Sequence, residues 1–524
     1  MVSDKERPAW TSTVVVAALL ILLATFAQGQ DSNWDLRNYH LYTPWAVMDG
    51  RLEGDIAAAQ LQTWHNPTLD FPFAAMVRAG LPGWLISLWL ALPAFIALAF
   101  ALNLMDRLWP ERNSRFRTIM AGLVAVMGAA MLPSIGTTFN DAFVGAGVLA
   151  ALWWAVDADG RRGPWATWLP VGLLAGVAAG LKLTGAIYCV GFIAAALVAG
   201  PLRSLPWRIL ALAAGGTAGA IATAGPWALH LWAEHGNPLF PYFNQWFQSA
   251  DALPIAHNDD RFRPRGLDAV LVPFQLLVDS RRFSESKLAD PRLLLGLVAL
   301  AIWTLRDRAA SEAADGRSGN ARRMIVAFVL ASYATWVYVY GIYRYLFALE
   351  LLLSVIVVAV LTEKIHTRFY KPILVGALLI LVAVSNRPGW GRQSFSTPMV
   401  DVEFPQLPPD SMVLLAEDAP LAHAVVFLPR AVPALSIANN FMSPERCTGL
   451  QAEAERRIAH HRGPLFLLRE AKPDASLAGA YNAYGLVLSD ACLPVQDSLM
   501  KVELCPLTRN PVAEAICPGT APDR

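Results

Sequence analysis

Apolar runs of about twenty residues recur along most of this chain, and they constrain its fold more than any other feature. A helix needs about 20 mostly apolar residues to cross the hydrocarbon core of a bilayer. Of the 524 residues, 55% are hydrophobic and only 16% are charged, with a mean hydropathy of +0.40. That composition is too apolar for an ordinary soluble protein. The sequence therefore predicts an all-α polytopic membrane protein over most of its length.

Eleven apolar windows each predict a membrane helix. The first window has a positive flank, Lys5 and Arg7, that would also suit a signal peptide. Because Ala27-Gln28-Gly29-Gln30 is a poor cleavage site, we interpret this window as an uncleaved first helix. The windows cover residues 14–29, 82–104, 118–134, 142–156, 168–181, 183–200, 209–232, 291–305, 324–341, 345–361 and 372–386.

Positive charges in short loops predict the orientation, since cytoplasmic loops carry an excess of Lys and Arg. With eleven spans and a cytoplasmic N-terminus, all five positive loops are cytoplasmic. One long tilted helix over 168–200 would give ten spans and would put the last two loops outside, so we expect a break around Gly180-Leu181-Lys182. The loop 233–290, predicted outside, also holds five Arg, but long loops follow the rule poorly. The five loops carry Arg107/Arg112/Arg115/Arg117, Arg161/Arg162, Arg203/Arg208, Arg306/Arg308/Arg317/Arg322/Arg323 and Lys364/Arg368/Lys371.

This orientation predicts four segments on the outer face of the membrane: residues 30–81, the connector 134–141, the loop 233–290 and everything after about 387. From residue 411, short β-like runs alternate with helix-like runs, as expected for a small α/β domain. We therefore expect a transmembrane domain over 1–387 and a periplasmic C-terminal α/β domain over 388–524. This organisation places the protein in the bacterial inner membrane, as a multi-pass chain with its C-terminal domain outside.

Four of the five cysteines lie in this predicted outer domain: Cys447, Cys492, Cys505 and Cys517. Disulfides persist in oxidising compartments, so these four predict two bridges, with three possible pairings. The alternative is that they are unpaired small hydrophobic residues. Their spacing is not that of a zinc site, and we expect no metal site from it.

The segment DSNWDLRNYHLYTPWAVMDG, residues 31–50, follows the first span and mixes acids with aromatic residues. Its aromatics suit a helix lying in the membrane interface. Asp35 and Tyr39 are one helical turn apart, and His40 follows, so all three are candidate site residues in interfacial helices of the first outer loop. The alternative for Asp35 is a helix cap.

Four further candidate residues stand at outer helix ends. Asn140 and Asp141 open the fourth window, where an acid is costly unless it is paired or used, although either could simply cap the helix. Lys182 lies at the expected helix break and could bind a lipid phosphate or extend to the surface. Arg344 precedes the tenth window and suits phosphate binding, or serves as an interface anchor.

Taken in order, these segments resemble the GT-C class of integral membrane glycosyltransferases, which includes protein O-mannosyltransferases and the bacterial enzymes that move aminoarabinose onto lipid A. WDLRNYHLYTPWAV is similar to the D-x-x-x-Y-H-x-P segment of their first outer loop, with the Pro displaced to position 44. NDAF resembles their second-loop acid, and GLKLTG their G-x-K-x-T turn. GNPLFPYFN and YRYLFALELL are similar to later segments, so the likeness spans about residues 10–360.

The resemblance implies an inverting transfer of a hexosyl or pentosyl unit from a polyprenyl-phosphate donor to an acceptor hydroxyl of a lipid or glycan. It assigns Asp35 as general base, with His40 as the alternative ranked below it, and Asp141 as a second acid that binds the acceptor or orients a cation. Lys182 and Arg344 would bind the phosphate, and Tyr39, His40 and Asn140 would line the substrate site. A divalent cation assists some relatives, so a metal cofactor stays open. Membrane lipids are expected partners, and the net charge of +1 gives no reason to expect nucleic acid.

Two other classes of protein are compatible with the sequence. A transporter or flippase of a lipid-linked glycan would show inverted repeats and charges at mid-span, whereas the acids here lie at helix ends. A non-catalytic membrane scaffold would leave the grouped acids and cations unexplained.

Overall fold

The computed structural model describes residues 9–110, 115–309, 316–364, 369–472, 479–510 and 516–517. The chain forms two compact units. The helical unit consists of Met1–Gly29, Ser87–Gly225 and Asp259–Trp390, and the mixed unit of Gln30–Ile86, Pro226–Asn258 and Gly391–Arg524. The mixed unit is thus larger than the C-terminal domain expected over 388–524, whose boundary stays a prediction. Among the loop cations, Arg112 and Arg368 lie outside the described residues, as do the side chains of Arg306, Arg308, Arg317 and Lys364.

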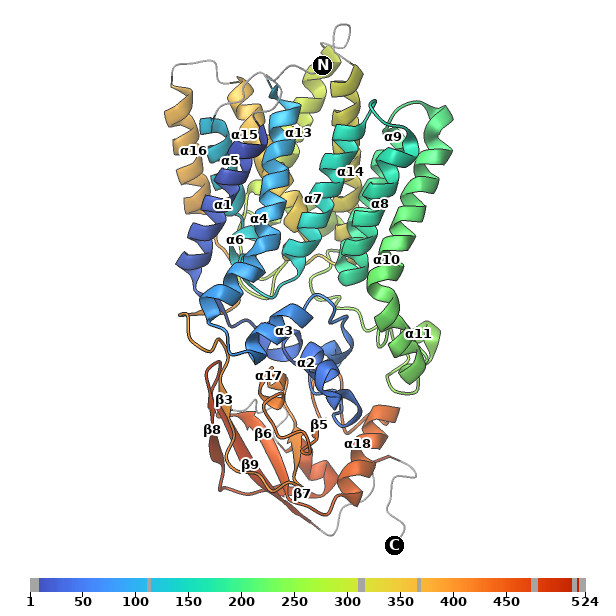
Figure 1. Ribbon diagram of the computed structural model, residues 1–524, viewed down its shortest axis with the longest axis vertical. Coiled ribbons are helices and arrows are strands. Elements are labelled where there is room, and N and C mark those ends of the chain that lie inside the picture. Colours follow the sequence, from blue (N-terminus) through green and yellow to red (C-terminus); the bar gives the residue numbers. More distant parts are fainter. Residues whose placement is uncertain are drawn as a thin grey trace. The chain divides into compact units, whose positions relative to one another are not determined.

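The helical unit is built from long apolar helices that run beside one another (Figure 1). Their buried faces form one continuous core that reaches from Ala17 to Leu381. α14 packs against α9, α7 against α8, α13 against α15, and α15 against α5. The helices are α1 Ala9–Gln28, α4 Gly83–Leu108, α5 Arg115–Val126, α6 Met131–Ser134, α7 Asp141–Ala158, α8 Pro164–Leu181, α9 Ala186–Val198, α10 Leu205–His235, α12 Leu267–Gln275, α13 Arg292–Ala309, α14 Gly316–Val339, α15 Phe347–Lys364 and α16 Tyr370–Val384.

All eleven apolar windows are mostly helical in the structure. Six helical segments of the described chain are long and apolar enough to cross a membrane, and three shorter ones are also apolar. The chain is therefore a multi-pass membrane protein, while the number of eleven spans stays a prediction. The six are Trp10–Gln28, Gly83–Leu108, Asp141–Ala158, Pro164–Leu181, Leu202–His235 and Tyr343–Glu363, and the three are Leu183–Val198, Arg292–Leu305 and Tyr370–Val384.

The expected break near residue 182 is confirmed. α8 ends at Leu181, Lys182 is extended, and the short 3-10 helix η6 Leu183–Gly185 leads into α9. α8 also approaches α10 very closely, because a Cβ added at Gly176 would lie 2.1 Å from the carbonyl oxygen of Gly216. Small residues at such a contact let two membrane helices pack backbone to backbone.

The window 118–134 is not one continuous helix, which corrects the sequence prediction. α5 ends at Val126 and α6 begins at Met131. Two buried acids from distant parts of the chain accept hydrogen bonds from backbone N–H groups at the break between α5 and α6. Asp290 accepts a hydrogen bond from Ala129 N (2.8 Å), and Glu350 accepts one from Met131 N (2.8 Å). A helix terminus leaves such N–H groups unpaired, so these carboxylates stabilise the break.

The mixed unit contains a seven-stranded sheet in the order β3-β8-β9-β6-β4-β5, with β7 also paired to β9. β4 runs parallel to β5 and β6, and the other pairs are antiparallel. Ala454 and Ile458 of α18 Gly449–His460 share a buried core with Leu467 of β6. The strands are β3 Val402–Glu403, β4 Met412–Leu415, β5 Ala434–Ser436, β6 Leu465–Glu470, β7 Leu486–Leu488, β8 Leu493–Asp497 and β9 Val502–Arg509.

Residues 30–86 attach to this sheet through a buried ion pair. Arg51 and Asp55 are paired at 3.0 Å. Arg51 Nη2 also donates to Val432 O (3.0 Å), and Ala434 N donates to Asp55 (2.8 Å). Burial raises the pKa of the Tyr42 phenol well above its usual range, so Tyr42 acts as a hydrogen-bond donor to Asp55. These contacts hold residues 30–86 at the β5 edge of the sheet.

The helices of this segment are short, and its aromatic residues are not arranged as expected. Tyr42 is fully buried, and Tyr39 and Trp45 are each 8% exposed. They pack inside the mixed unit, which corrects the expectation of an exposed aromatic face, while the interfacial position of these helices stays a prediction. The segment contains the π-helix η2 Leu36–His40, α2 Tyr42–Asp49, the 3-10 helices η3 Arg51–Glu53 and η4 Gln60–Trp64, and α3 Phe71–Arg78.

The four C-terminal cysteines form two disulfides, as predicted. Cys447 pairs with Cys517 across 70 residues, and Cys492 pairs with Cys505 across 13 residues. The second bridge joins the residue directly before β8 to β9, and these two strands are neighbouring and antiparallel. Cys189, in α9, is a free thiol.

Candidate active site

Asp35 immediately precedes the π-helix η2 and is only 9% exposed. Its side chain does not cap this helix, because Leu36 N donates instead to Asn33 Oδ1 at 2.7 Å. The Tyr39 hydroxyl, one helical turn further along the chain, donates to Asp35 Oδ2 at 3.4 Å. Asp35 is therefore a buried carboxylate held by a local tyrosine, and its local role is not that of a helix cap.

His40, the last residue of η2, forms a pair with Asp70. His40 Nδ1 lies 2.8 Å from Asp70 Oδ2, and both residues are buried. The ring of Tyr39 lies 4.0 Å from the imidazole, centroid to centroid. His40 Nε2 is buried and has no hydrogen-bond partner within the described part of the chain. A carboxylate on one ring nitrogen fixes the tautomer and leaves the other nitrogen for a substrate or proton.

A second group of candidates meets in the helical unit. Asp141 is the first residue of α7, Lys182 follows α8, and Arg344 lies in the 3-10 helix η8 Tyr343–Leu346 that precedes α15. Lys182 Nζ lies 2.9 Å from Asp141 Oδ1, and Arg344 Nη1 lies 3.8 Å from Asp141 Oδ2. Three residues that are far apart in sequence thus place one acid between two cations.

Aromatic rings and a second acid complete this group. The Arg344 guanidinium lies 4.5 Å from the ring centroid of Phe139, and Lys182 Nζ lies 5.5 Å from that of Tyr345. Glu285 Oε1 lies 3.6 Å from Arg344 Nη2. The side chain of Asp141 is 3% exposed, whereas those of Lys182 and Arg344 are 16% and 10% exposed. The acid is thus enclosed while both cations keep some access to their surroundings.

This arrangement bears on the alternatives for Lys182, Asn140 and Asp141. Lys182 does not extend freely to the surface, because it is paired with Asp141. Asn140 occupies the cap position of α7, but its side chain makes no capping hydrogen bond. Paired with two cations, Asp141 is suited to orienting them, which is one of the two roles expected for it. The cations are suited to binding an anion such as phosphate.

The seven candidates form two groups, one in each unit. Asp35, Tyr39 and His40 belong to the mixed unit, and Asn140, Asp141, Lys182 and Arg344 to the helical unit. Sequence reasoning missed Asp70 and Glu285 as partners of these groups. Asp70 lies directly before α3, and an acid at the start of a helix was the available signal. Nothing in the sequence singled out Glu285.

One group of three potential metal ligands occurs in the described part of the chain: Cys492, Glu503 and Cys505. Both of its cysteines are joined in a disulfide, and zinc requires the free thiolate as ligand. This group is therefore a structural bridge.

Comparisons with known proteins identify the fold. No family model and no curated protein matches this chain. Apo ArnT from Cupriavidus metallidurans superposes with a TM-score of 0.53 at 12% identity, over 94% of this chain and 97% of that chain. A second structure of that ArnT, bound to undecaprenyl phosphate, gives 0.47 at 11% identity over 98% of both chains. The predicted GT-C-like fold is thus confirmed, and this chain is a multi-pass membrane protein with the fold of ArnT.

Proposed function

We propose that this protein is a membrane glycosyltransferase that takes a sugar from a polyprenyl-phosphate donor and passes it to an acceptor hydroxyl. The observation that carries the proposal is the meeting of Lys182 and Arg344 at Asp141, on the ends of membrane helices. Cations at that level suit the phosphate of a lipid whose tail stays in the bilayer. The fold supports the same reading, since ArnT is a GT-C lipid A aminoarabinose transferase.

The chemistry needs a base and a stabilised leaving group. In this proposal, Asp35 accepts the proton of the acceptor hydroxyl while the oxygen attacks the anomeric carbon. The bond from that carbon to the lipid phosphate breaks, and the electron pair leaves with the phosphate oxygen. Lys182 and Arg344 stabilise the resulting negative charge, and Asp141 orients both cations. A single displacement inverts the anomeric configuration.

The substrate residues and the side of the membrane belong to the same proposal. Tyr39 holds Asp35, and His40 and Asn140 line the substrate site. The sugar is a hexose or a pentose, and the acceptor is a lipid or glycan. The reaction takes place on the outer face of the inner membrane, where the two disulfides of the mixed unit would persist.

The test is a transfer assay on the purified full chain in nanodiscs. The donors are polyprenyl phosphates that carry radiolabelled hexoses or pentoses, and envelope lipids and glycans serve as acceptors. We expect free polyprenyl phosphate to form together with a labelled acceptor, and both to vanish in the variant that combines Asp35→Asn with Lys182→Ala. In proteoliposomes, movement of intact donor between leaflets without cleavage would instead identify a flippase and refute the proposal.

A further inference from the structure

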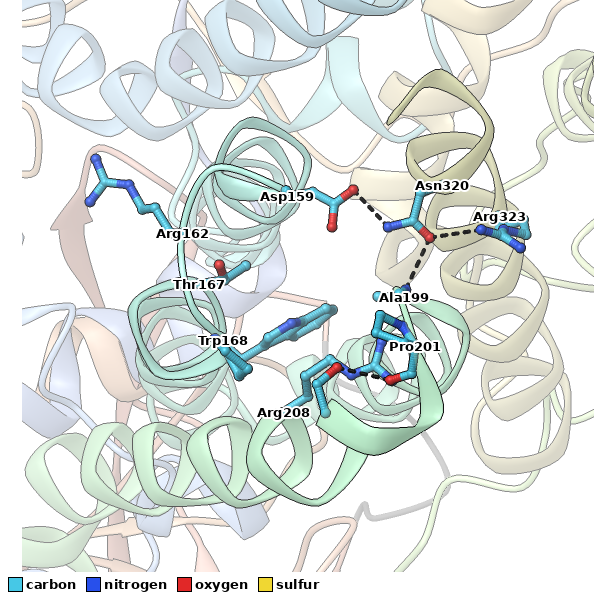
Figure 2. Close-up of a pocket in the computed structure, with 13 residues that line it drawn as sticks. Asp159, Arg162, Thr167, Trp168, Ala199, Pro201, Arg208, Asn320 and Arg323 are labelled. Atoms are coloured by element: carbon cyan, nitrogen blue, oxygen red, sulfur yellow. Dashed lines mark hydrogen bonds between the residues drawn. The ribbon is translucent and has the colours of Figure 1, made fainter. Parts of the chain in front are cut away.

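A cavity of about 400 Å³ lies in the helical unit, away from the candidate active site. It is formed where α7 ends, α8 begins, α9 passes into α10 and α14 begins, as Figure 2 shows. Asp159, which follows α7, lines the cavity, whereas Asp141 begins that helix. The 18 residues of α7 span roughly 27 Å at about 1.5 Å per residue. The cavity therefore lies at the end of α7 that is opposite to the end carrying Asp141 of the candidate active site.

Positive charge predominates in its lining. Arg162, Arg208 and Arg323 line the cavity, against the single acid Asp159. That acid is already engaged, because Asn320 Nδ2 donates to Asp159 Oδ2 at 2.6 Å. Figure 2 shows the two side chains pointing toward each other, with Asn320 also accepting from Arg323 Nη2 at 3.2 Å. The lining is thus suited to an anion.

Among the lining residues, Arg208 gives the strongest indication that the cavity binds a ligand, because of its burial and its hydrogen-bond donors. It is only 3% exposed, and its Nη2 donates to the carbonyl oxygen of Pro201 at 3.2 Å. Its Nε and Nη1 are buried and have no hydrogen-bond partner within the described residues. A buried charge with unused donors costs free energy unless something binds it. Figure 2 shows Arg208 along the wall of the cavity, with its hydrogen bond to Pro201 drawn, and Trp168 also lines the cavity.

The surroundings of the cavity are those of a membrane boundary. The nearby Trp165, Leu202 and Trp207 are 44%, 78% and 54% exposed, and exposed Trp is typical of the level of lipid head groups. The three connections that form the cavity also carry positive charges of the loops predicted to be cytoplasmic. Basic pockets between membrane helices on that side suit phospholipid head groups.

We propose that this cavity binds a phosphate group, supplied by the head group of an anionic phospholipid, with Arg208 as its main ligand. A guanidinium binds phosphate oxygens through several N–H groups at once, and Arg208 has donors to spare. Trp168 and Pro201 would border the head group. This site is separate from the proposed site of sugar transfer, because it lies where α7 ends, whereas Asp141 lies where α7 begins.

The test compares phosphate sources on the purified full chain in detergent. Lipid binding is followed by native mass spectrometry and by the melting temperature. The probes are phosphatidylglycerol, phosphatidylcholine with the same acyl chains, and soluble glycerol 3-phosphate. We expect phosphatidylglycerol to bind and to raise the melting temperature more than phosphatidylcholine. Arg208→Gln should weaken this binding about tenfold or more, as expected for the loss of hydrogen bonds from a charged group.

Arg203→Gln is the matched control, because Arg203 is exposed on the connection that leads into α10 and lies outside the cavity lining, and its substitution removes the same charge. It should bind phosphatidylglycerol as the wild type does. If Arg208→Gln does not fold, Ser204→Trp tests the same site by filling the cavity from its lining. Equal binding by the wild type, Arg208→Gln and Ser204→Trp would refute the site. An Arg208-dependent response to glycerol 3-phosphate alone would keep the phosphate site and refute the lipid source.

Discussion

Lys182 Nζ lies 2.9 Å from Asp141 Oδ1, although 41 positions separate the two residues in the chain (182 − 141). The pair joins the end of α8 to the start of α7, which pack against each other. Arg344 reaches the same carboxylate from η8. One acid thus positions two cations that come from different helices.

Replacing Lys182 by Ala should weaken donor binding more than it slows the chemical step. A phosphate that loses a charged hydrogen-bond partner binds about tenfold or more weakly. We expect the KM for the polyprenyl-phosphate sugar to rise by that factor in nanodiscs. Lys371→Ala is the control, because Lys371 lies at the start of α16, in a loop predicted to be cytoplasmic. An unchanged KM for Lys182→Ala would remove Lys182 from the donor site.

Asp141→Asn should destabilise the protein, because it leaves two cations enclosed without their acid. Breaking a buried pair by removing one partner costs up to about 3–5 kcal/mol, and removing both partners costs less. We therefore expect a lower melting temperature for Asp141→Asn and a partial recovery for the double variant Asp141→Asn/Lys182→Met. Strictly additive effects of the two substitutions would show that this contact contributes little to stability.

Asp35→Asn should lower kcat by about 10² to 10⁴-fold, because the amide keeps the size of the side chain but cannot accept the proton. The measurement is the turnover of the correctly inserted variant in the transfer assay. Glu53→Gln is the matched control, since Glu53 is an exposed acid of the same segment. Turnover at the wild-type rate would show that Asp35 is not the base.

The same transfer assay tests whether the general base is Asp35 or His40, which is paired with Asp70. If Asp35 is the base, Asp70→Asn should reorient His40 and cost about tenfold or less in kcat. If His40 is the base, loss of its orienting carboxylate should be the more damaging change. A larger loss of kcat for Asp70→Asn than for Asp35→Asn would therefore transfer the role of base to His40.

The two disulfides should contribute unequally to stability. In the chain-entropy treatment, a loop of 70 residues stabilises by about 4 kcal/mol and one of 13 residues by about 3 kcal/mol. Cys447→Ser/Cys517→Ser should therefore lower the melting temperature more than Cys492→Ser/Cys505→Ser. Unreduced peptide mapping should show both bridges in the wild type. Free thiols at all four positions would contradict the pairing.

The orientation in the membrane can be tested with alkaline phosphatase, which is active only outside the cytoplasm. We expect a fusion after Arg392 to be active and one within residues 310–315 to be inactive. The physical reason is the cluster of Arg around 306–323, which favours the cytoplasmic side. The opposite pair of activities would invert the topology and contradict a periplasmic reaction.

The sequence by itself determined the elements that depend on local composition. Apolar length predicted the membrane helices, because the bilayer core requires it. The distribution of positive loops predicted the break between α8 and α9, because one helix over 168–200 would have placed the last two positive loops outside. The concentration of cysteines after residue 446 predicted two disulfides. Each of these signals can be read from the linear sequence, through composition and the distribution of charge, without the contacts between distant residues.

Tertiary structure alone decided the features that depend on distant partners. Asp290 and Glu350 divide the window 118–134 into α5 and α6, although they lie more than a hundred residues away from it. Asp70 engages His40 because α3 follows η2 in a compact segment, and Asp141 meets Lys182 and Arg344 because three helix ends converge. Hydrophobic periodicity fixes which residues are buried, but the pairing of buried charges requires the three-dimensional arrangement of the helices.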